Sequence, residues 1–324
     1  MSSINPAFEA MNSLGRSATP FLFVIDFALR EPLVKPLNTI DANQLKIQIG
    51  SYTNHSSRQT SPAGSYKFSL IPPDKQSYRR SFEQVMFHLR RGDSYLLNLT
   101  MPVRIKTSLT LEDIYFRSKA SYKIWWRDRF TVFSPEPFVK IDNGMIYTFP
   151  MKGTIDANLP NAEARLLADP KERAEHFTIV DLLRNDLNSV AQNVHVDRFR
   201  YVEKIQTSRG ALLQTSSVIS GKLPTDYAAN LGSIFAALLP AGSISGAPKK
   251  RTVELIQLAE NYQRGFYTGV MGVFDGKSLN SGVLIRFIEK DEKGLIFKAG
   301  GGITVNSKWE DEYAELLQKV YLPF

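Results

Sequence analysis

Short runs of β-forming residues separated by turn residues are the feature that most constrains how this chain can fold. We expect strands at residues 20–27, 45–52, 66–71, 94–105, 130–133, 138–141, 145–149, 269–274, 281–290 and 295–298. Apolar residues recur at helical spacing in other segments, which predicts helices at residues 75–91, 111–120, 161–167, 170–187, 227–239, 248–259 and 309–320. Because strands outnumber helices and mostly adjoin hairpin-length turns, the pattern predicts an α+β fold with antiparallel sheets.

The composition narrows the class of protein. Of the 324 residues, 43% are hydrophobic, enough for one large mixed domain or two average ones. The net charge is +8, but the basic residues are scattered in short pairs without a nucleic-acid motif, so we expect an anionic metabolite and no nucleic acid. Residues 1–19 lack signal-peptide features, and the apolar segment 21–29 is too short to span a bilayer. A cytoplasmic protein with no membrane partner is expected.

The chain contains no cysteine. Disulfides, thiolate metal sites and cysteine nucleophiles are therefore excluded together.

A Gly/Ser/Pro-rich turn enters an amphipathic helix within residues 238–256. Pro248 suits the first helical turn, and Ser245 or Gly246 can cap the helix. Free N–H groups at such a start suit an anionic or carbonyl-bearing ligand. The spacing excludes a Walker phosphate loop. The same residues also fit a plain loop-to-helix junction.

Two of the expected helices carry acidic residues at i, i+3 spacing. Glu172, Glu175 and His176 share one helical face, as do Glu312 and Glu315 with Lys319. Paired carboxylates can hold a hard cation through oxygen ligands. A solvated, charged helix face is the alternative explanation for both helices.

Several other residues are candidates for chemistry, each with an ordinary structural alternative. Arg286 lies in an otherwise apolar predicted strand, and a glycine run at 300–302 follows the next strand as an expected loop. Lys152 stands at a strand end, where lysines are usually solvated, and Glu136 stands between two prolines, where an exposed turn residue is common.

The turn Pro240-Ala-Gly-Ser-Ile-Ser-Gly-Ala-Pro-Lys249 closely resembles the signature turn of the chorismate-utilising enzymes. This family includes anthranilate synthase component I, aminodeoxychorismate synthase component I and the isochorismate and salicylate synthases. Four further matches keep the family's order, and the resemblance covers about residues 81–324. It implies a single chorismate-binding domain over residues 1–324, with shortened N-terminal strands at 1–74 and a catalytic core at 75–324. It also implies a two-lobed antiparallel β-sandwich with flanking helices and an active site between the lobes.

The resemblance assigns roles to individual residues. It implies that Glu175 and Glu315 bind Mg²⁺ directly, with Glu172 and Glu312 nearby. It implies that Lys152 is a nucleophile and Glu136 an acid/base group. Substrate contacts are implied for Gly153, Thr154, Ser245, Gly246, Tyr267, Arg286, Gly300, Gly301, Gly302 and Lys319.

Lys152 favours one branch of the family. Aminodeoxychorismate synthases commonly carry lysine at this position, whereas anthranilate and isochorismate synthases carry alanine. The resemblance therefore implies amination of chorismate with ammonia to 4-amino-4-deoxychorismate, the precursor of p-aminobenzoate and folate. Because the chain lacks cysteine, ammonia from a separate glutamine amidotransferase subunit is expected. The alternatives are anthranilate synthase component I and a non-catalytic chorismate-fold binding protein.

Three positions depart from the family pattern. Leu96 stands where water-using members carry a general-base lysine and ammonia-using members usually a glutamine; leucine cannot activate water, which argues against an isochorismate synthase. Leu213 replaces a histidine found in many anthranilate synthases, and Ile155 replaces a common arginine.

Overall fold

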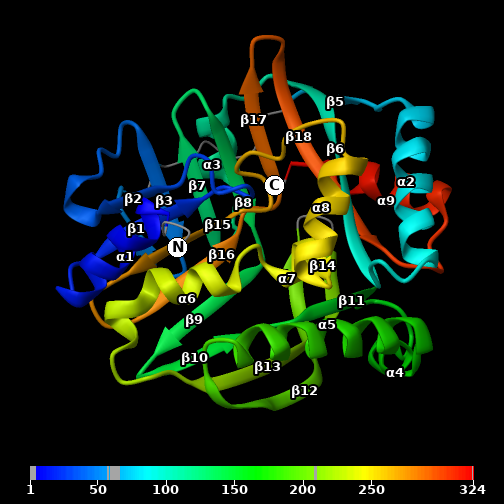
Figure 1. Cartoon of the computed structure of the whole chain (residues 1–324). Coiled ribbons are helices and arrows are strands. Elements are labelled where there is room, and N and C mark those ends of the chain that lie inside the picture. Colours follow the sequence, from blue (N-terminus) through cyan, green and yellow to red (C-terminus); the bar gives the residue numbers. More distant parts are fainter. Residues whose placement is uncertain (1–4, 57, 59–65, 208–209, 323) are drawn as a thin grey trace. The chain divides into compact units, whose positions relative to one another are not determined.

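The computed structural model describes residues 5–56, 58, 66–207, 210–322 and 324 (Figure 1). Its helices are α1 Pro6–Arg16, α2 Lys75–Arg90, α3 Leu111–Arg117, α4 Ala162–Ala168, α5 Pro170–Asn188, α6 Leu231–Leu238, α7 Gly242–Ser245, α8 Lys249–Ala259 and α9 Trp309–Gln318, with 3₁₀ turns η1 Leu37–Thr39 and η2 Tyr227–Asn230. Its strands are β1 Phe21–Ile25, β2 Leu33–Pro36, β3 Leu45–Ile49, β4 Tyr52–Thr53, β5 Phe68–Ile71, β6 Leu96–Thr107, β7 Tyr122–Trp126, β8 Phe130–Ser134, β9 Pro137–Asp142, β10 Met145–Thr148, β11 Met151–Asp156, β12 Gln192–Thr207, β13 Gly210–Lys222, β14 Gly246–Ala247, β15 Val270–Phe274, β16 Leu279–Val283, β17 Phe287–Asp291 and β18 Gly294–Ile303.

The strands form two sheets. One has the order β11-β13-β10-β9-β16-β15-β1-β2, with β12 also paired to β13. The other has the order β14-β6-β18-β17-β8-β7-β3-β4, with β5 also paired to β6. The pairs that contain candidate residues, β11–β13 in one sheet and β14–β6 and β18–β6 in the other, are all antiparallel. The predicted α+β fold with antiparallel sheets is confirmed.

The chain divides into two compact units, each built from segments distant in sequence. Unit 1 comprises residues 1–21, 137–243 and 273–281, and unit 2 comprises residues 22–136, 244–272 and 282–324.

In unit 1, helices α4 and α5 lie along the strands β11, β12 and β13 (Figure 1). Helix α1, which the sequence analysis did not predict, packs on α6 and on η2 at two glycines. A Cβ at Gly232 would lie 1.9 Å from the Phe8 carbonyl oxygen, and a Cβ at Gly15 would lie 1.9 Å from the Ala228 carbonyl oxygen. Glycine at both positions is therefore what lets the two backbones approach.

In unit 2, helices α2, α8 and α9 pack on the strands β6 and β18 (Figure 1). The side chains predicted to line the buried side of α2, namely Phe82, Val85, Met86 and Leu89, are all buried. A single core cluster joins these side chains to alternate residues of β6 and to Tyr313 and Leu316 of α9. This packing holds β6 and β18 rigidly next to the α9 helix.

Two predictions around the C-terminal strands are wrong. The segment expected as one strand at 281–290 is broken, because Arg286 has a φ of +53° and the chain turns there between β16 and β17. The glycines 300–302, expected as a loop, continue β18 and pair with β6. Pairing with a neighbouring strand, which local sequence does not reveal, decides both cases.

One stretch, Tyr227–Ser245, is long and apolar enough to cross a membrane by length and composition alone. It is broken into η2, α6 and α7, and half of its apolar window is buried. Leu231, Phe235 and Leu238 of α6 are buried, as expected of the core helix of a folded unit.

Candidate functional site

Lys152 lies on β11 beside a break in the strand register. The register between β11 and β13 shifts from Lys152 to Thr154, because Gly153, with a φ of +84°, forms a bulge. The Lys152 carbonyl accepts a hydrogen bond from the Thr215 hydroxyl, which ties this side of the bulge to β13. The Lys152 ammonium lies 2.8 Å from Oε2 of Glu175, and its side chain is 43% exposed. Lys152 is thus an ion-paired, partly exposed ammonium.

Helix α5 presents the carboxylate of Glu172, in its first turn, to this bulge. Asp169 caps the helix by accepting a hydrogen bond from the Glu172 N–H at 3.0 Å, and Pro170 occupies the first turn. A Cβ at Gly153 would lie 2.7 Å from Oε2 of Glu172, so only glycine allows this approach. Burial, and then the negative charge of Glu175, raise the pKa of Glu172. Oε2 of Glu172 is buried and has no hydrogen-bond partner among the described residues.

His176, next to Glu175, is fully buried and anchors α5 to β13. Its Nε2 lies 2.7 Å from the Ser217 hydroxyl, and its Nδ1 lies 3.5 Å from the Thr215 hydroxyl that also bonds Lys152. Burial, helped by the positive charge of Arg200, lowers the pKa of His176 to about 4. His176 is therefore a neutral and weakly basic structural group at neutral pH.

In unit 2, the acidic residues of α9 lie over the glycine-rich half of β18. A Cβ at Gly301 would lie 3.3 Å from Oε2 of Glu312, 3.5 Å from Nζ of Lys319 and 3.7 Å from Oε1 of Glu315. Lys319 donates to the Gly300 carbonyl oxygen at 2.8 Å and forms an ion pair with Glu315 at 2.7 Å. The structure therefore brings together the glycine run, both acidic residues and the lysine that the sequence analysis singled out.

Arg286, Tyr267 and Glu136 lie in one neighbourhood of unit 2. Arg286 adopts a left-handed backbone conformation, which costs energy for a non-glycine residue. Its Nε is buried without a hydrogen-bond partner among the described residues. Burial raises the pKa of Tyr267, and the charges of both Arg286 and Glu136 act on the phenol as weaker influences. A buried guanidinium N–H with an unused donor suits a carboxylate ligand.

The signature turn pairs with the start of β6. Gly246, with a φ of +126°, lies opposite Leu97, and a Cβ on it would lie 1.8 Å from the Leu96 carbonyl oxygen. Ser245 is fully buried at the end of α7. The predictions that Pro248 occupies the first turn of the helix and that Ser245 or Gly246 caps it are wrong. Pro248 precedes the helix with an extended ψ of 138°, and both other residues belong to elements of their own.

A buried ion pair that the sequence analysis missed supports β6. Glu260 and Arg264 bond each other at 2.6 Å with side chains only 2% exposed. Glu260 also accepts hydrogen bonds from the Thr100 N–H and hydroxyl, each at 2.8 Å, and Arg264 donates to the Asn98 carbonyl oxygen at 2.6 Å. The i, i+4 spacing of an acid and a base was the available signal, but that spacing usually marks a surface pair.

Two family departures lie together on unit 1. Ile155 of β11 and Leu213 of β13 are direct cross-strand partners. The two departures that the resemblance identified on this unit therefore form one apolar cross-strand pair. Leu96, the third departure, is the first residue of β6 and pairs with Ala247 of the signature turn.

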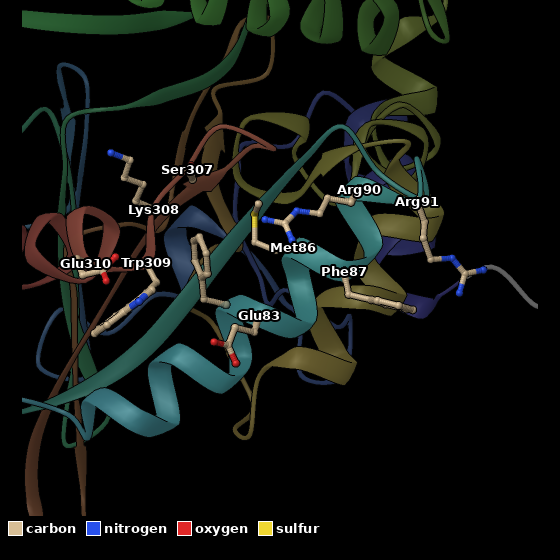
Figure 2. Close-up of a pocket in the computed structure, with 10 residues that line it drawn as sticks. Glu83, Met86, Phe87, Arg90, Arg91, Ser307, Lys308, Trp309 and Glu310 are labelled. Carbon is tan, nitrogen blue, oxygen red and sulfur yellow. The ribbon is translucent and has the colours of Figure 1, made fainter.

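A pocket of about 520 Å³ in unit 2 lies apart from the residues assigned by the resemblance. Figure 2 shows it between α2 and the start of α9, with Met86, Phe87 and Trp309 among its lining residues. It contains none of the predicted site residues.

Among the residues that the structure describes, no group of three or more His, Asp or Glu side chains is placed to hold a metal ion. Each unit instead offers a pair of carboxylates. The donor set fits Mg²⁺, which keeps several waters and uses few protein carboxylates. The unpartnered, buried Oε2 of Glu172 is the structural observation in favour of a cation at α5. Against it, Glu175 and Glu315 already have lysine partners.

The structure thus places the candidate residues in two groups. Unit 1 holds Lys152, Gly153, Thr154, Glu172 and Glu175, and unit 2 holds Glu136, Ser245, Gly246, Tyr267, Arg286, Gly300, Gly301, Gly302, Glu312, Glu315 and Lys319. Cationic side chains and a glycine run beside paired carboxylates in an α+β fold are typical of proteins that bind small anionic ligands.

Comparison with known proteins specifies this class. The family model for chorismate binding enzymes matches residues 31–323, so the chain belongs to the chorismate-binding enzyme family. The chain is 51% identical to an uncharacterized PabA-like protein of Pasteurella multocida over 99% of both chains. It is 34% identical to aminodeoxychorismate synthase component 1 of Salmonella typhimurium, over 75% of this chain and 56% of that protein. Its fold is similar to that of anthranilate synthase component I from Streptococcus pneumoniae, with a TM-score of 0.66, 26% identity, and coverage of 79% of this chain and 59% of that one.

Proposed function

We propose that this protein is the chorismate-aminating component of an aminodeoxychorismate synthase. The observation that carries the proposal is Lys152, a lysine beside the Glu172 and Glu175 carboxylates at a glycine bulge. Family membership supports chorismate as the substrate. The 34% identity to a Salmonella aminodeoxychorismate synthase component 1 supports amination as the reaction.

The proposed reaction has two substitutions. Nζ of Lys152 attacks C2 of chorismate, both ring double bonds shift, and the C4 hydroxyl leaves as water with a proton from Glu136. Ammonia then attacks C4, the double bonds shift back, and the lysine leaves C2 to give 4-amino-4-deoxychorismate. Because Lys152 is ion-paired as an ammonium, it must lose a proton before it attacks.

The remaining residues are proposed to bind and orient the substrate. Arg286 has an unused buried N–H that suits a substrate carboxylate, and the Gly300–Gly302 backbone has no side chains to block a close approach. We further propose that Glu175 and Glu315 would bind Mg²⁺ directly, with Glu172 and Glu312 nearby. When bound, this ion would neutralise and position the ring carboxylate of chorismate.

The test is incubation of the purified protein with chorismate, Mg²⁺ and ammonium, followed by chromatography and mass identification of the product. We expect 4-amino-4-deoxychorismate, and a loss of turnover of at least about a hundredfold for Lys152→Ala, because the nucleophile is removed. Omission of Mg²⁺ should abolish turnover. Lys171→Ala is the matched control, since Lys171 is an exposed lysine 3.9 Å from the same Glu175 and should leave turnover nearly unchanged.

Other products would contradict the proposal. Anthranilate would identify an anthranilate synthase component I. Tight chorismate binding without any product would identify a non-catalytic binding protein. Full activity of Lys152→Ala with the expected product would disprove the nucleophilic role alone.

A further inference from the structure

The side-chain amide of Asn98 is the strongest feature that the proposed mechanism leaves unused. Its Oδ1 atom is buried and has no hydrogen-bond partner among the described residues of the chain. Buried side-chain acceptors are nearly always paired, so an unpaired one needs an explanation. A ligand with an N–H or O–H donor is one such explanation.

Asn98 stands between the two backbone segments assigned to substrate binding. On one edge, β6 pairs with the signature turn, with Leu97 opposite Gly246. On its other edge β6 pairs with the glycine run, with Asn98 directly opposite Gly302. Because its cross-strand partner has no side chain, Asn98 has no neighbour there to bond its amide.

Strand alternation gives Asn98 the same face as Leu96 and Thr100. Leu97 and Leu99 point into the hydrophobic core on the opposite face. The Asn98 face is held in place by the buried Arg264, which bonds the Asn98 carbonyl oxygen at 2.6 Å, and by Glu260, which bonds Thr100. The backbone that carries the amide is therefore anchored at Asn98 and at Thr100.

An amide oxygen can only accept hydrogen bonds, so its ligand must carry an N–H or O–H donor. As an acceptor it cannot contact the two carboxylates of chorismate, which also only accept hydrogen bonds. The proposed reaction supplies two donors, the C4 hydroxyl and ammonia, and Glu136 already serves the leaving hydroxyl. Leu96 on the same face offers no competing hydrogen bond. The attacking nitrogen must be neutral ammonia, because ammonium has no lone pair, and the apolar Leu96 side chain disfavours the charged form.

We propose that Asn98 binds the attacking ammonia, its Oδ1 accepting one N–H hydrogen bond. The inference rests on the proposed amination of chorismate and adds the residue that recognises the nitrogen nucleophile. Under this proposal, Asn98 helps to determine that ammonia is the nucleophile.

The experiment measures the KM for ammonia and the KM for chorismate of the wild-type protein, Asn98→Ala and Asn98→Leu at one pH. Both variants remove the acceptor, and leucine keeps the same number of side-chain heavy atoms and the same branching at Cγ. The loss of one hydrogen bond should raise the KM for ammonia about fivefold to tenfold in each variant. The KM for chorismate should stay within about twofold. Asn43→Ala, at an exposed turn of the same unit, is the control and should change neither value.

Three results would overturn the inference. An unchanged KM for ammonia in an active variant would remove Asn98 from nucleophile binding and leave the proposed function intact. A raised KM for chorismate alone would show that the amide nitrogen binds a substrate carboxylate instead. A wild-type protein that forms no aminated product would overturn the inference and the proposed function together.

Discussion

At the scale of single residues, the site residues owe their properties to neighbours that are distant in sequence. Burial and the negative charge of Glu175 raise the pKa of Glu172 and so disfavour its charged form. The same Glu175 forms an ion pair with the ammonium of Lys152 and so favours the charged form of the lysine. The proposed nucleophile and the proposed metal ligands therefore share one carboxylate, and a change at Glu175 should affect both roles.

His176 makes a testable contribution to stability. Its pKa is lowered from the ordinary 6.5 to about 4. Between these values the unfolded chain binds a proton that the folded chain does not, so stability is present above pH 6.5 and falls as the pH drops toward 4. The free energy of unfolding should fall by roughly 3 kcal/mol over this range, because a difference of one pKa unit corresponds to about 1.36 kcal/mol.

The measurement is urea unfolding of the wild-type protein and His176→Gln at pH 7 and pH 4.5. The variant should be less stable at pH 7 but should lose less stability on acidification, because glutamine does not titrate. Equal losses in the two proteins would contradict the lowered pKa.

At the scale of elements, the pairing of β6 with β18 fixes the position of the glycine run at residues 300–302. The glycine run lies inside this pair, where Gly300 faces Thr100 and Gly302 faces Asn98. A Cβ at Gly300 would lie 2.3 Å from the Leu99 carbonyl oxygen, whereas a Cβ at Gly302 would meet only the end of the Leu96 side chain at 3.1 Å. A side chain at position 300 would thus clash with backbone, whereas a side chain at position 302 would meet only a movable side chain.

Gly300→Ala and Gly302→Ala should distinguish these two cases. Gly300→Ala forces a backbone shift and should lower the free energy of unfolding by about 2 kcal/mol or more. Gly302→Ala should cost less than about 1 kcal/mol, because the Leu96 side chain can rotate away. Chemical denaturation midpoints of the two variants provide the comparison. Equal destabilisation would show that the β6–β18 backbone spacing is not the constraint.

At the scale of the whole molecule, the chain lacks a cysteine that could release ammonia from glutamine for the proposed reaction. Release of ammonia from glutamine normally uses a cysteine nucleophile, and the chain has none. We therefore propose a separate glutamine amidotransferase subunit as its partner. The net charge of +8 suits attraction of the dianionic substrate.

The proposed partner predicts which nitrogen source the isolated protein can use for amination. With chorismate and Mg²⁺, ammonium should support product formation, and glutamine alone should give less than about 1% of that rate because no glutaminase nucleophile is present. Product assay with each nitrogen source decides the matter. Sustained turnover with glutamine in a preparation free of other proteins would contradict the proposed partner.

The sequence by itself determined the elements whose signals are local. The apolar spacing of α2 predicted its buried face, and the strand and turn pattern predicted antiparallel sheets. The spacing of Glu172 and Glu175 on α5, and of Glu312 and Glu315 on α9, follows from the period of a helix. The order of residues 240–249 indicated the family, which the comparison confirmed.

Only the tertiary structure decided what depends on contacts between distant segments. The positive φ of Arg286, the glycine run within β18 and the position of Asn98 opposite Gly302 all follow from strand pairing. The burial of Glu260 with Arg264 follows from packing against β6, although the same spacing usually marks a surface pair. Register and burial are set by the neighbour that a strand or side chain meets, and one chain segment does not contain that information.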